Sequence, residues 1–444
     1  MNIINNIKKE FEGDHTLKIK EISISNYLLY VVYINGLSDE AKIADFIIRP
    51  IINNDDIIVL LPNQKKVTYN EGINNLISGE ALLIYDDTIL SIDCKNSPIR
   101  GFSEPESETV EKGPKLGFVE NILFNITLIR SNLKSSKIKI KYIELDGENK
   151  NKMAIMYVDN LVDKKVLEEL ENRINKILPI TTLDPNMIRE KIKDHPYSSY
   201  KTIGSTERPD VAINKLLDGK IVLFVDGSPT CLTLPFIFKE NFISPDDYYI
   251  NFYYSSFNRL IRILCFLISI LLPGFYLSLI MYHQELIPTK LAMSLILSRM
   301  GVSFPSFVEI LFLLISFDII RETGSKIPSS LGTALSIVAG IVLGQAVVEA
   351  KIVSTAVIII TSLSSLTGII NTNVKSTIII WRIIIFFFAL IMGFHGFLTG
   401  LILFIIYLVS IKSFNEEYLK DFFNFDIKRY KDTYIRYPFK GDKK

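Results

Sequence analysis

Long apolar segments lie only in the second half of the chain, and they predict membrane-spanning helices. Residues 260–282 are 23 residues with one charge near the start. At about 1.5 Å per residue they are long enough to cross a hydrocarbon core of about 30 Å. Residues 333–350 and 352–370 predict two further spans. The apolar run at 377–411 is too long for one crossing and just long enough for two.

A shorter apolar segment, residues 307–320, contains Glu309 and Asp318. It predicts either a span buried in protein or a re-entrant segment, because a charge in contact with lipid is costly. We expect the last apolar run to turn at residues 393–396 (GFHG). Together these segments give six crossings, or four to five if the short segment is re-entrant. An even number returns the basic C-terminal tail to the cytoplasmic side, which the positive-inside rule favours.

The first 258 residues show the shorter periodicities of an α/β protein. Residues 137–145 (KIKIKYIEL) alternate Lys with Ile, which predicts a half-buried strand. An apolar stripe in residues 166–177 predicts a helix. Further strands are expected at 28–34, 57–61, 81–85, 153–158, 220–225 and 230–234, the last two joined by an Asp226-Gly227 turn.

The predicted fold is an α/β soluble N-terminal module of two subdomains, followed by an all-α polytopic transmembrane module of about four to six spans. The soluble module covers residues 1–258, and a Pro-, Gly- and Glu-rich stretch divides it into subdomains at about 1–115 and 116–258. The transmembrane module covers residues 259–411. A basic C-terminal tail covers residues 412–444.

The distribution of charge supports this division. The 444 residues contain 49 Lys and Arg against 48 Asp and Glu. Residues 259–411 hold nine basic and five acidic groups, and residues 412–444 hold nine and six, so residues 1–258 hold 31 and 37. This balance argues against a nucleic-acid partner, which would require a surplus of positive charge. A mean hydropathy of +0.28 excludes a disordered chain. Because the N-terminus shows no apolar signal-peptide core, we expect the first module on the cytoplasmic side.

One predicted membrane helix carries a stripe of small residues. Gly332, Ser336, Gly340 and Gly344 are spaced four apart, which lets two helices approach closely in lipid. Gln345 and Glu349 lie one turn apart on a neighbouring stripe. One interpretation places these two polar groups on a water-filled ion path. The other places Glu349 at the membrane interface, paired with Lys351.

Five charged residues surround the short apolar segment. They form either a buried coupling network or a set of interfacial anchors, and they are Arg299, Glu309, Asp318, Arg321 and Glu322. His283 and His395 are isolated in the sequence, so we expect structural roles for both.

The sequence contains none of the common catalytic motifs. It lacks the P-loop, the dinucleotide-binding, the HExxH and the GxSxG patterns, so we expect no enzyme activity, no catalytic residues and no cofactor. Asp226 in the DGSP turn is expected to serve the backbone conformation of the turn. No metal site is expected, since the acidic 104–120 stretch matches no Ca²⁺ loop and the three cysteines have no metal spacing.

Several strings in order resemble the A subunits of the GerA-type spore germinant receptors, from about residue 28 to about residue 411. They are RGFSEPESETVEKGPKLGFVENILFNITLIR, TERPDVAINKLLDGKIVLFVDGSP, SPDDYY, LPGFYLSLIMYHQELIPTKL, SRMGVSFP and IVAGIVLGQAVVEAKIVS. The resemblance implies a non-enzymatic receptor subunit of the spore inner membrane. Its partners would be membrane lipid, a transporter-like B subunit, a lipoprotein C subunit and further copies of the A subunit. In this family the A subunit is proposed to form a ring that conducts monovalent cations when nutrient binds.

The chain departs from the family pattern at a few positions. Met300-Gly301 follows Arg299 where an acidic residue is usual, Asp318 stands where Glu is common, and Lys326 replaces an Arg. These changes put the coupling network in question. The tail after Ser413 lacks the proline-rich ending of the family, so no role for the tail follows from the resemblance.

Two other functions remain open on the sequence alone. One is a secondary transporter, in which Pro273-Gly274 supplies a broken helix at the substrate site. The other is a signalling scaffold that senses a ligand through its soluble module. In the scaffold, substitutions at the soluble-module motif residues Arg208 and Asp210 would abolish the response.

Overall fold

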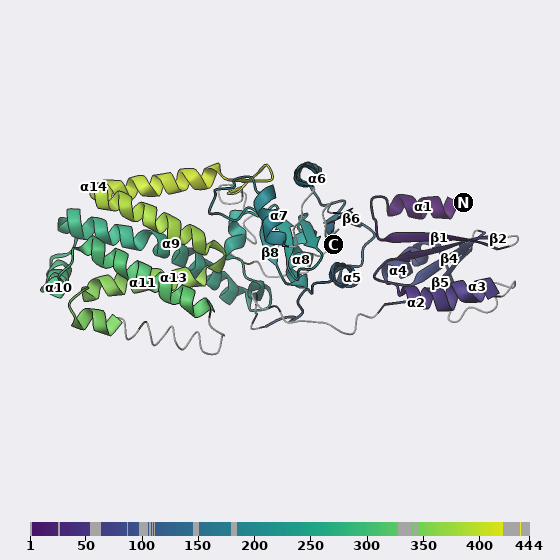
Figure 1. Cartoon of the computed structure of the whole chain (residues 1–444), viewed down its shortest axis with the longest axis horizontal. Helices are drawn as coiled ribbons and strands as arrows, with labels where there is room; N and C mark the ends of the chain where they lie inside the picture. Colours follow the sequence, from purple (N-terminus) through teal and green to yellow (C-terminus); the bar gives the residue numbers. More distant parts are fainter. Residues whose placement is uncertain are drawn as a thin grey trace. The chain divides into compact units, whose positions relative to one another are not determined.

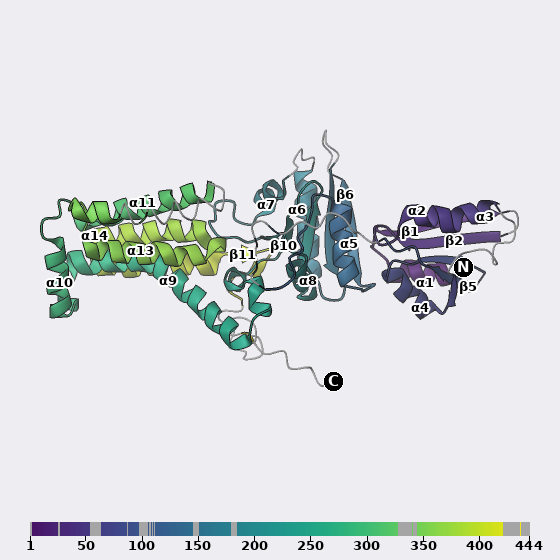
Figure 2. The same cartoon turned by 90° about the horizontal axis from the view of Figure 1, so that it is seen from below.

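The computed structural model describes residues 2–24, 27–53, 64–86, 88–96, 105, 108, 110, 112–144, 151–178, 184–326, 340, 344–420 and 436. The chain divides into two compact units (Figures 1 and 2). The first unit comprises Met1–Pro196, Thr202–Phe236 and Ser413–Glu416, and the second comprises Tyr197–Lys201, Ile237–Lys412 and Glu417–Lys444. The domain bounds expected from the sequence remain predictions.

The first α/β subdomain contains a five-stranded antiparallel sheet in the order β1-β2-β4-β5-β3. Its strands are β1 (Leu17–Ile24), β2 (Tyr27–Ile34), β3 (Lys65–Val67), β4 (Ala81–Tyr85) and β5 (Thr88–Ile92). Its helices are α1 (Asn2–Glu10), α2 (Glu40–Ile43), η1 (Ala44–Ile48), α3 (Arg49–Asn53) and α4 (Tyr69–Ile77). Alternate residues of β2 point to opposite faces. Val32 and Ile34 pack with α1 and α4, whereas Leu29 and Val31 pack with the α2–α3 stretch.

The second α/β subdomain repeats this layered plan with the strand order β6-β7-β9-β10-β8. Its strands are β6 (Ile138–Glu144), β7 (Lys152–Val158), β8 (Gly204–Thr206), β9 (Ile221–Val225) and β10 (Cys231–Leu234). Its helices are α5 (Ile122–Asn132), α6 (Lys164–Ile177), α7 (Pro185–Ile192) and α8 (Pro209–Leu217). Met153 and Ile155 of β7 pack with α6 and α7, and Ala154 and Met156 pack with α5 and α8.

The sequence predicted most of these strands correctly. The β9–β10 hairpin is confirmed, with antiparallel pairing and Gly227 at φ +87° in the connecting turn. The alternating KIKIKYIEL segment forms β6 as expected. The expected strand at 57–61 lies outside the described residues.

A short segment after the last helix completes the second α/β subdomain. Phe414 is fully buried in its core, and the Arg173 guanidinium lies 4.5 Å from the centre of the Phe414 ring. The Ser413 hydroxyl donates to the Thr202 carbonyl (2.6 Å) and accepts from the Phe236 amide (3.1 Å). The chain therefore leaves the first unit at Phe236 and returns to it for four residues beginning at Ser413.

The second unit is a bundle of helices that run side by side in both views (Figures 1 and 2). The long helices are α9 (Phe252–Tyr282), α11 (Ser306–Lys326), α13 (Thr355–Ile370) and α14 (Lys375–Ser410). Shorter elements are η2 (Phe238–Phe242), η3 (Pro245–Tyr248), η4 (Gln284–Leu286), α10 (Thr289–Arg299), η5 (Thr372–Val374), β11 (Lys412–Ser413) and β12 (Glu416–Glu417). Gly274, beside Pro273 in α9, allows close approach to α14, since a Cβ on Gly274 would lie 3.1 Å from Ile385.

Helix α14 folds back on itself at Gly393, whose φ of +60° and ψ of −136° interrupt the helix. Gly400 on the second half packs against Ile385 on the first, and the rings of Phe404 and Trp381 meet edge to face with centres 5.2 Å apart, so the halves run antiparallel. At position 393 only a glycine fits, because the φ of Gly393 is positive and a Cβ there would lie 2.7 Å from the Tyr282 ring. The expected turn at residues 393–396 is therefore present.

Two helical segments, Phe252–Tyr282 and Thr372–Ser410, are long and apolar enough to cross a membrane, and Thr355–Ile370 is apolar but shorter. The short segment expected at 307–320 lies within the 21-residue helix α11. Most of the span expected at 333–350 lies outside the described residues. The structure therefore supports two candidate spans by length and composition, and the count of four to six remains a prediction.

Candidate functional site

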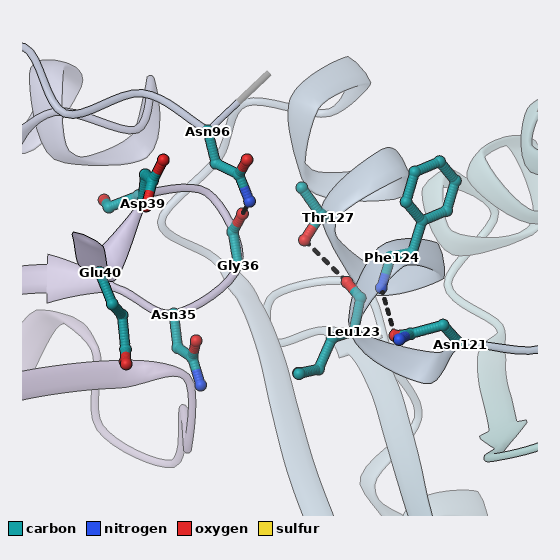
Figure 3. Close-up of a pocket in the computed structure, with 10 residues that line it drawn as sticks. Asn35, Gly36, Asp39, Glu40, Asn96, Asn121, Leu123, Phe124 and Thr127 are labelled. Carbon is teal, nitrogen blue, oxygen red and sulfur yellow. Dashed lines mark hydrogen bonds between the residues drawn. The ribbon is translucent and has the colours of Figure 1, made fainter. Parts of the chain in front are cut away.

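A polar cleft opens between the two α/β subdomains of the first unit (Figure 3). A cavity of about 430 Å³ is lined by Asn35, Gly36, Ser38, Asp39, Glu40, Asn96, Asn121, Leu123, Phe124 and Thr127. A second cavity of about 620 Å³ is lined by His15, Lys18, Asn35, Asn121, Ile122, Leu123, Tyr142, Glu144, Lys152 and Asp226. Asn35, Asn121 and Leu123 line both, so the two cavities are parts of one cleft. Small-molecule pockets usually enclose about 300 to 1,000 Å³, so the cleft is large enough for such a ligand.

The first subdomain contributes the turn after β2 and the start of α2. The Asp39 carboxylate caps α2 by accepting from the Ala41 amide (2.9 Å). Glu40 accepts from the Tyr33 hydroxyl (3.1 Å), and the Asn96 side chain donates to the Gly36 carbonyl (3.1 Å). These contacts fix two carboxylates and an amide group on one wall of the cleft (Figure 3).

The second subdomain contributes the N-terminal turn of α5. Asn121 caps this helix by accepting from the Phe124 amide (3.1 Å), and Asp226 accepts from the Ile122 amide (3.2 Å). The positive end of the helix dipole therefore faces the cleft opposite Asp39 and Glu40 (Figure 3). Asp226, expected only to shape its turn, also caps a helix and lines the larger cavity.

A buried ion pair joins the two subdomains beside the cleft. Asp14, in the turn after α1, pairs with Arg130 of α5, and their side chains are 0% and 3% exposed. Lys139 of β6 donates to the Glu10 carbonyl (2.6 Å), and burial lowers the pKa of this lysine. The Tyr142 amide donates to His15 Nδ1 (3.2 Å). Residues 10–16 of the first subdomain therefore contact β6, the edge strand of the second sheet.

Arg208 and Asp210 hold the linker between the subdomains. Arg208 donates bidentately to the Asp210 carboxylate (3.0 and 2.8 Å) and also donates to the Pro114 carbonyl (2.9 Å). Glu108, also in the linker, accepts from the Thr206 hydroxyl (2.5 Å), and burial raises the pKa of this carboxyl. Neither Arg208 nor Asp210 is among the residues that line the two described cavities.

In the second unit, the SPDDYY string forms an ionic anchor at the start of α9. Asp247 is 1% exposed, and its carboxylate accepts from Arg259 (3.0 Å) and bidentately from Arg262 (2.8 and 2.9 Å). The Ser244 amide donates to the same carboxylate (3.1 Å). The Arg262 guanidinium, 17% exposed, therefore lies on this buried aspartate.

The predicted coupling residues separate into two clusters. At the end of the bundle that contains Arg259, called here the Arg259 end, Asp318 of α11 accepts from Arg321 (2.8 Å) and from Arg382 of α14 (2.6 Å). Glu322 pairs with Lys375 at 3.3 Å. The Asn371 side chain donates to the Arg262 carbonyl (2.9 Å), which places the start of α14 beside α9.

The other two coupling residues lie at the opposite end, called here the Arg299 end. The buried Glu309 carboxylate accepts from the Ser354 amide (2.8 Å) and lies 3.7 Å from Arg299. Glu309 therefore joins α11 to the start of α13. His283 and His395 are neighbours, with ring centres 6.1 Å apart, although the sequence shows each as isolated.

The small-residue stripe is only partly described. Gly332 and Ser336 lie outside the described residues, and no described atom lies within 4 Å of a Cβ built on Gly340 or Gly344. Gln345 and Glu349 are exposed. Among the described residues Glu349 forms no ion pair with Lys351, which packs beside Gly301.

The charges of residues 259–411 are unequally divided between the two ends. Among the described side chains, the Arg259 end holds five basic and two acidic residues: Arg259, Arg262, Arg321, Lys375, Arg382, Asp318 and Glu322. The Arg299 end holds three of each: Lys290, Arg299, Lys351, Glu285, Glu309 and Glu349. Aromatic side chains also gather at the Arg259 end, where Tyr407 lies 5.2 Å from Trp381 and 6.0 Å from Tyr200.

Sequence reasoning missed the partners that these residues meet through the fold. Arg382 and Asp247 complete the two ionic clusters of the Arg259 end, and Asp14 and Arg130 join the subdomains. Arg382 had a visible signal, since it is a charge within a long apolar run. Asp14 and Arg130 had none, because they lie 116 residues apart.

The described residues thus form an α/β unit of two subdomains with a ligand-sized cleft, and a helical unit with two candidate membrane spans. Comparison with known families identifies the class more closely. The model described as "Bacillus/Clostridium GerA spore germination protein" matches residues 5–444. The chain therefore belongs to the GerA family.

Individual relatives extend over nearly the whole chain. Spore germination protein KA of Bacillus subtilis (strain 168) is 32% identical over 98% of this chain and 84% of its own length. The uncharacterized membrane protein YfkQ of the same organism is 30% identical over 96% of this chain and 86% of its own length. The crystal structure of the N-terminal domain of the A subunit of the Bacillus megaterium spore germinant receptor GerK3 aligns with 53% of this chain and 94% of that chain, at 24% identity and a TM-score of 0.40.

Proposed function

We propose that this chain is the A subunit of a nutrient-responsive spore germinant receptor and has no catalytic activity of its own. The observation that carries the proposal is the family match over residues 5–444, which includes both units. The relatives named as spore germination proteins support a role in starting germination.

The subunit works in a complex with a transporter-like B subunit, a lipoprotein C subunit and further copies of itself. Nutrient binding shifts the complex between two arrangements, because the nutrient has different affinities for them. One arrangement releases monovalent cations. Gln345 and Glu349 are exposed, and no described atom lies within 4 Å of a Cβ built on Gly340 or Gly344, which supports a place for these residues at contacts with other copies and along the ion path.

The second unit crosses the spore inner membrane several times, with the Arg259 end on the cytoplasmic side. The surplus of three basic charges among the described side chains of that end supports this orientation, because cytoplasmic membrane edges are enriched in Lys and Arg. The ring cluster of Tyr200, Trp381 and Tyr407 supports a membrane interface at the same end. The first unit and the C-terminal tail then lie on the cytoplasmic side.

Complete receptor reconstituted in K⁺-loaded vesicles should release K⁺ only when nutrient is present. Gly344→Leu should block assembly and release together, since a large side chain prevents close helix contact. K⁺ flux and size-exclusion profiles measure the two effects. Ile359→Leu, at an exposed position elsewhere in the bundle, is the control. Normal flux and normal oligomer size in Gly344→Leu would contradict the packing role.

The cleft favours a second candidate function, in which the first unit senses a small ligand directly. Carboxylates of Asp39 and Glu40 lie on one wall, and the N-terminus of α5 lies on the other. This pairing suits a small polar molecule with opposite charges at its two ends, because each end meets a group of the opposite sign.

Leu123→Trp tests the cleft, because Leu123 lines both cavities and is 41% exposed, so a larger ring fills the cleft without disturbing a core. We expect nutrient-triggered K⁺ release to fall at least tenfold while the thermal unfolding temperature stays within a few degrees. Leu217→Trp, at a similarly exposed position on α8, is the matched control. An unchanged response in Leu123→Trp would remove the cleft from the mechanism.

A further inference from the structure

The charge cluster between α11 and α14 holds more positive than negative charge. Among the described side chains, Arg321, Arg382 and Lys375 pair with the two carboxylates of Asp318 and Glu322, so three cations share two carboxylates. Asp318 and Glu322 are four residues apart on α11, and Lys375 and Arg382 are seven apart on α14, so each set shares one face of its helix. The surplus therefore lies in a seam between two facing helices.

The surplus charge is accessible from one side of this seam. Arg382 is 1% exposed and holds Asp318 at 2.6 Å, so Asp318 is neutralised from the buried side. Arg321 and Lys375 are 17% and 39% exposed, and they form the accessible side. The Lys375–Glu322 contact is a surface ion pair, which is weak in water.

The hydrogen bonding of the two arginines is also incomplete. Each donates to Asp318 through Nη2, whereas Nε of Arg321 and Nε of Arg382 are buried without a hydrogen-bond partner in the described part of the chain. Of the two arginines, only Arg321 lies on the accessible side of the seam, so an incoming acceptor meets its guanidinium and not that of Arg382. A guanidinium with a free edge suits phosphate oxygens, which it binds with charge-assisted hydrogen bonds.

We propose that this seam binds the phosphate of an anionic phospholipid headgroup, with Arg321 and Lys375 in contact with it and Arg382 positioning Asp318 behind them. The inference rests on the proposed membrane insertion of the second unit. The seam lies at the Arg259 end, which has a surplus of basic residues and a cluster of aromatic rings. Such residues mark the depth of lipid headgroups in membrane proteins. Basic pockets between membrane helices on the cytoplasmic side recognise such headgroups.

The full chain is first reconstituted in nanodiscs that contain equal amounts of phosphatidylcholine and phosphatidylglycerol. It is then extracted into detergent together with the lipids that remain bound to it. Native mass spectrometry counts the lipids retained. We expect phosphatidylglycerol to be retained in preference to phosphatidylcholine. Arg321→Gln and Lys375→Gln should each lower that retention about fivefold, as expected from one basic residue near a lipid surface. Lys290→Gln, an exposed lysine of the Arg299 end, should leave it unchanged.

Three outcomes would overturn the proposal. The first is equal retention of the two lipids by the unaltered chain. The second is the same phosphatidylglycerol retention in Arg321→Gln, Lys375→Gln and Lys290→Gln. The third is displacement of the lipid by millimolar inorganic phosphate, which would assign the site to a soluble anion. Alkaline extraction of membranes tests the proposed membrane insertion separately, because alkali releases proteins that are not inserted. Release of the chain would contradict the proposed insertion, whereas the three outcomes above contradict lipid binding alone.

Discussion

Asp14→Ala should separate the two α/β subdomains and lower the free energy of unfolding by about 3 to 5 kcal/mol. The substitution leaves Arg130 charged, buried and without its carboxylate. Desolvation of that guanidinium is then no longer offset by an ion pair. The turn at residues 10–16 also positions Lys139 and β6, so its loss should open the cleft.

Thermal unfolding of the full chain and amide hydrogen exchange in β6 measure this effect. The control is Asp45→Ala, which removes an i,i+4 pair with Arg49 whose side chains are 51% and 74% exposed. Such surface pairs contribute about 0 to 1 kcal/mol, so the control should unfold like the unaltered chain. Equal behaviour of the two variants would show that the buried pair does not hold the subdomains together.

Asp247→Ala should prevent stable insertion of α9, because it leaves two arginines at the start of this candidate span without their shared carboxylate. Breaking a buried ion pair from one side costs about 3 to 5 kcal/mol, and here two cations lose the same partner. We expect the amount of folded protein in the membrane fraction to fall at least tenfold. Fluorescence-detected size-exclusion chromatography of solubilised membranes measures this amount.

Asp246→Ala is the matched control for this second prediction, since it removes the neighbouring carboxylate of the same turn and leaves the shared Asp247 contacts in place. The double variant Asp247→Ala with Arg262→Gln should recover part of the folded protein, because one of the two unpaired charges is gone. Normal levels of folded protein in Asp247→Ala would show that the anchor is dispensable. Low levels in Asp247→Ala with no recovery in the double variant would show that the charge of Arg262 is not the cause of the loss.

Local patterns predicted the features that local forces determine. The Lys-Ile alternation defines β6, the Asp226-Gly227 turn joins β9 to β10, and Gly393 allows α14 to reverse. In each case neighbouring residues restrict the backbone, so the signal lies within a few positions of the sequence.

The sites depend on contacts that only the tertiary fold creates. The cleft brings the turn at Asn35 to the helix start at Asn121, and Asp318 meets Arg382 across 64 residues. A single sequence shows the charges but not their partners. It predicted one coupling network where the structure has two clusters at opposite ends of the bundle, because charges on one helix more than two turns apart reach different neighbours.

The burial of Phe414 affects the order in which this protein can be synthesised and folded. Its side chain fills the core of the second α/β subdomain, yet in the chain it follows all the described helices from α9 to α14. During synthesis that core therefore lacks one large aromatic ring until the helices from α9 to α14 have been made. A fragment that ends before α9 would contain both sheets and leave a cavity at the place of the Phe414 ring.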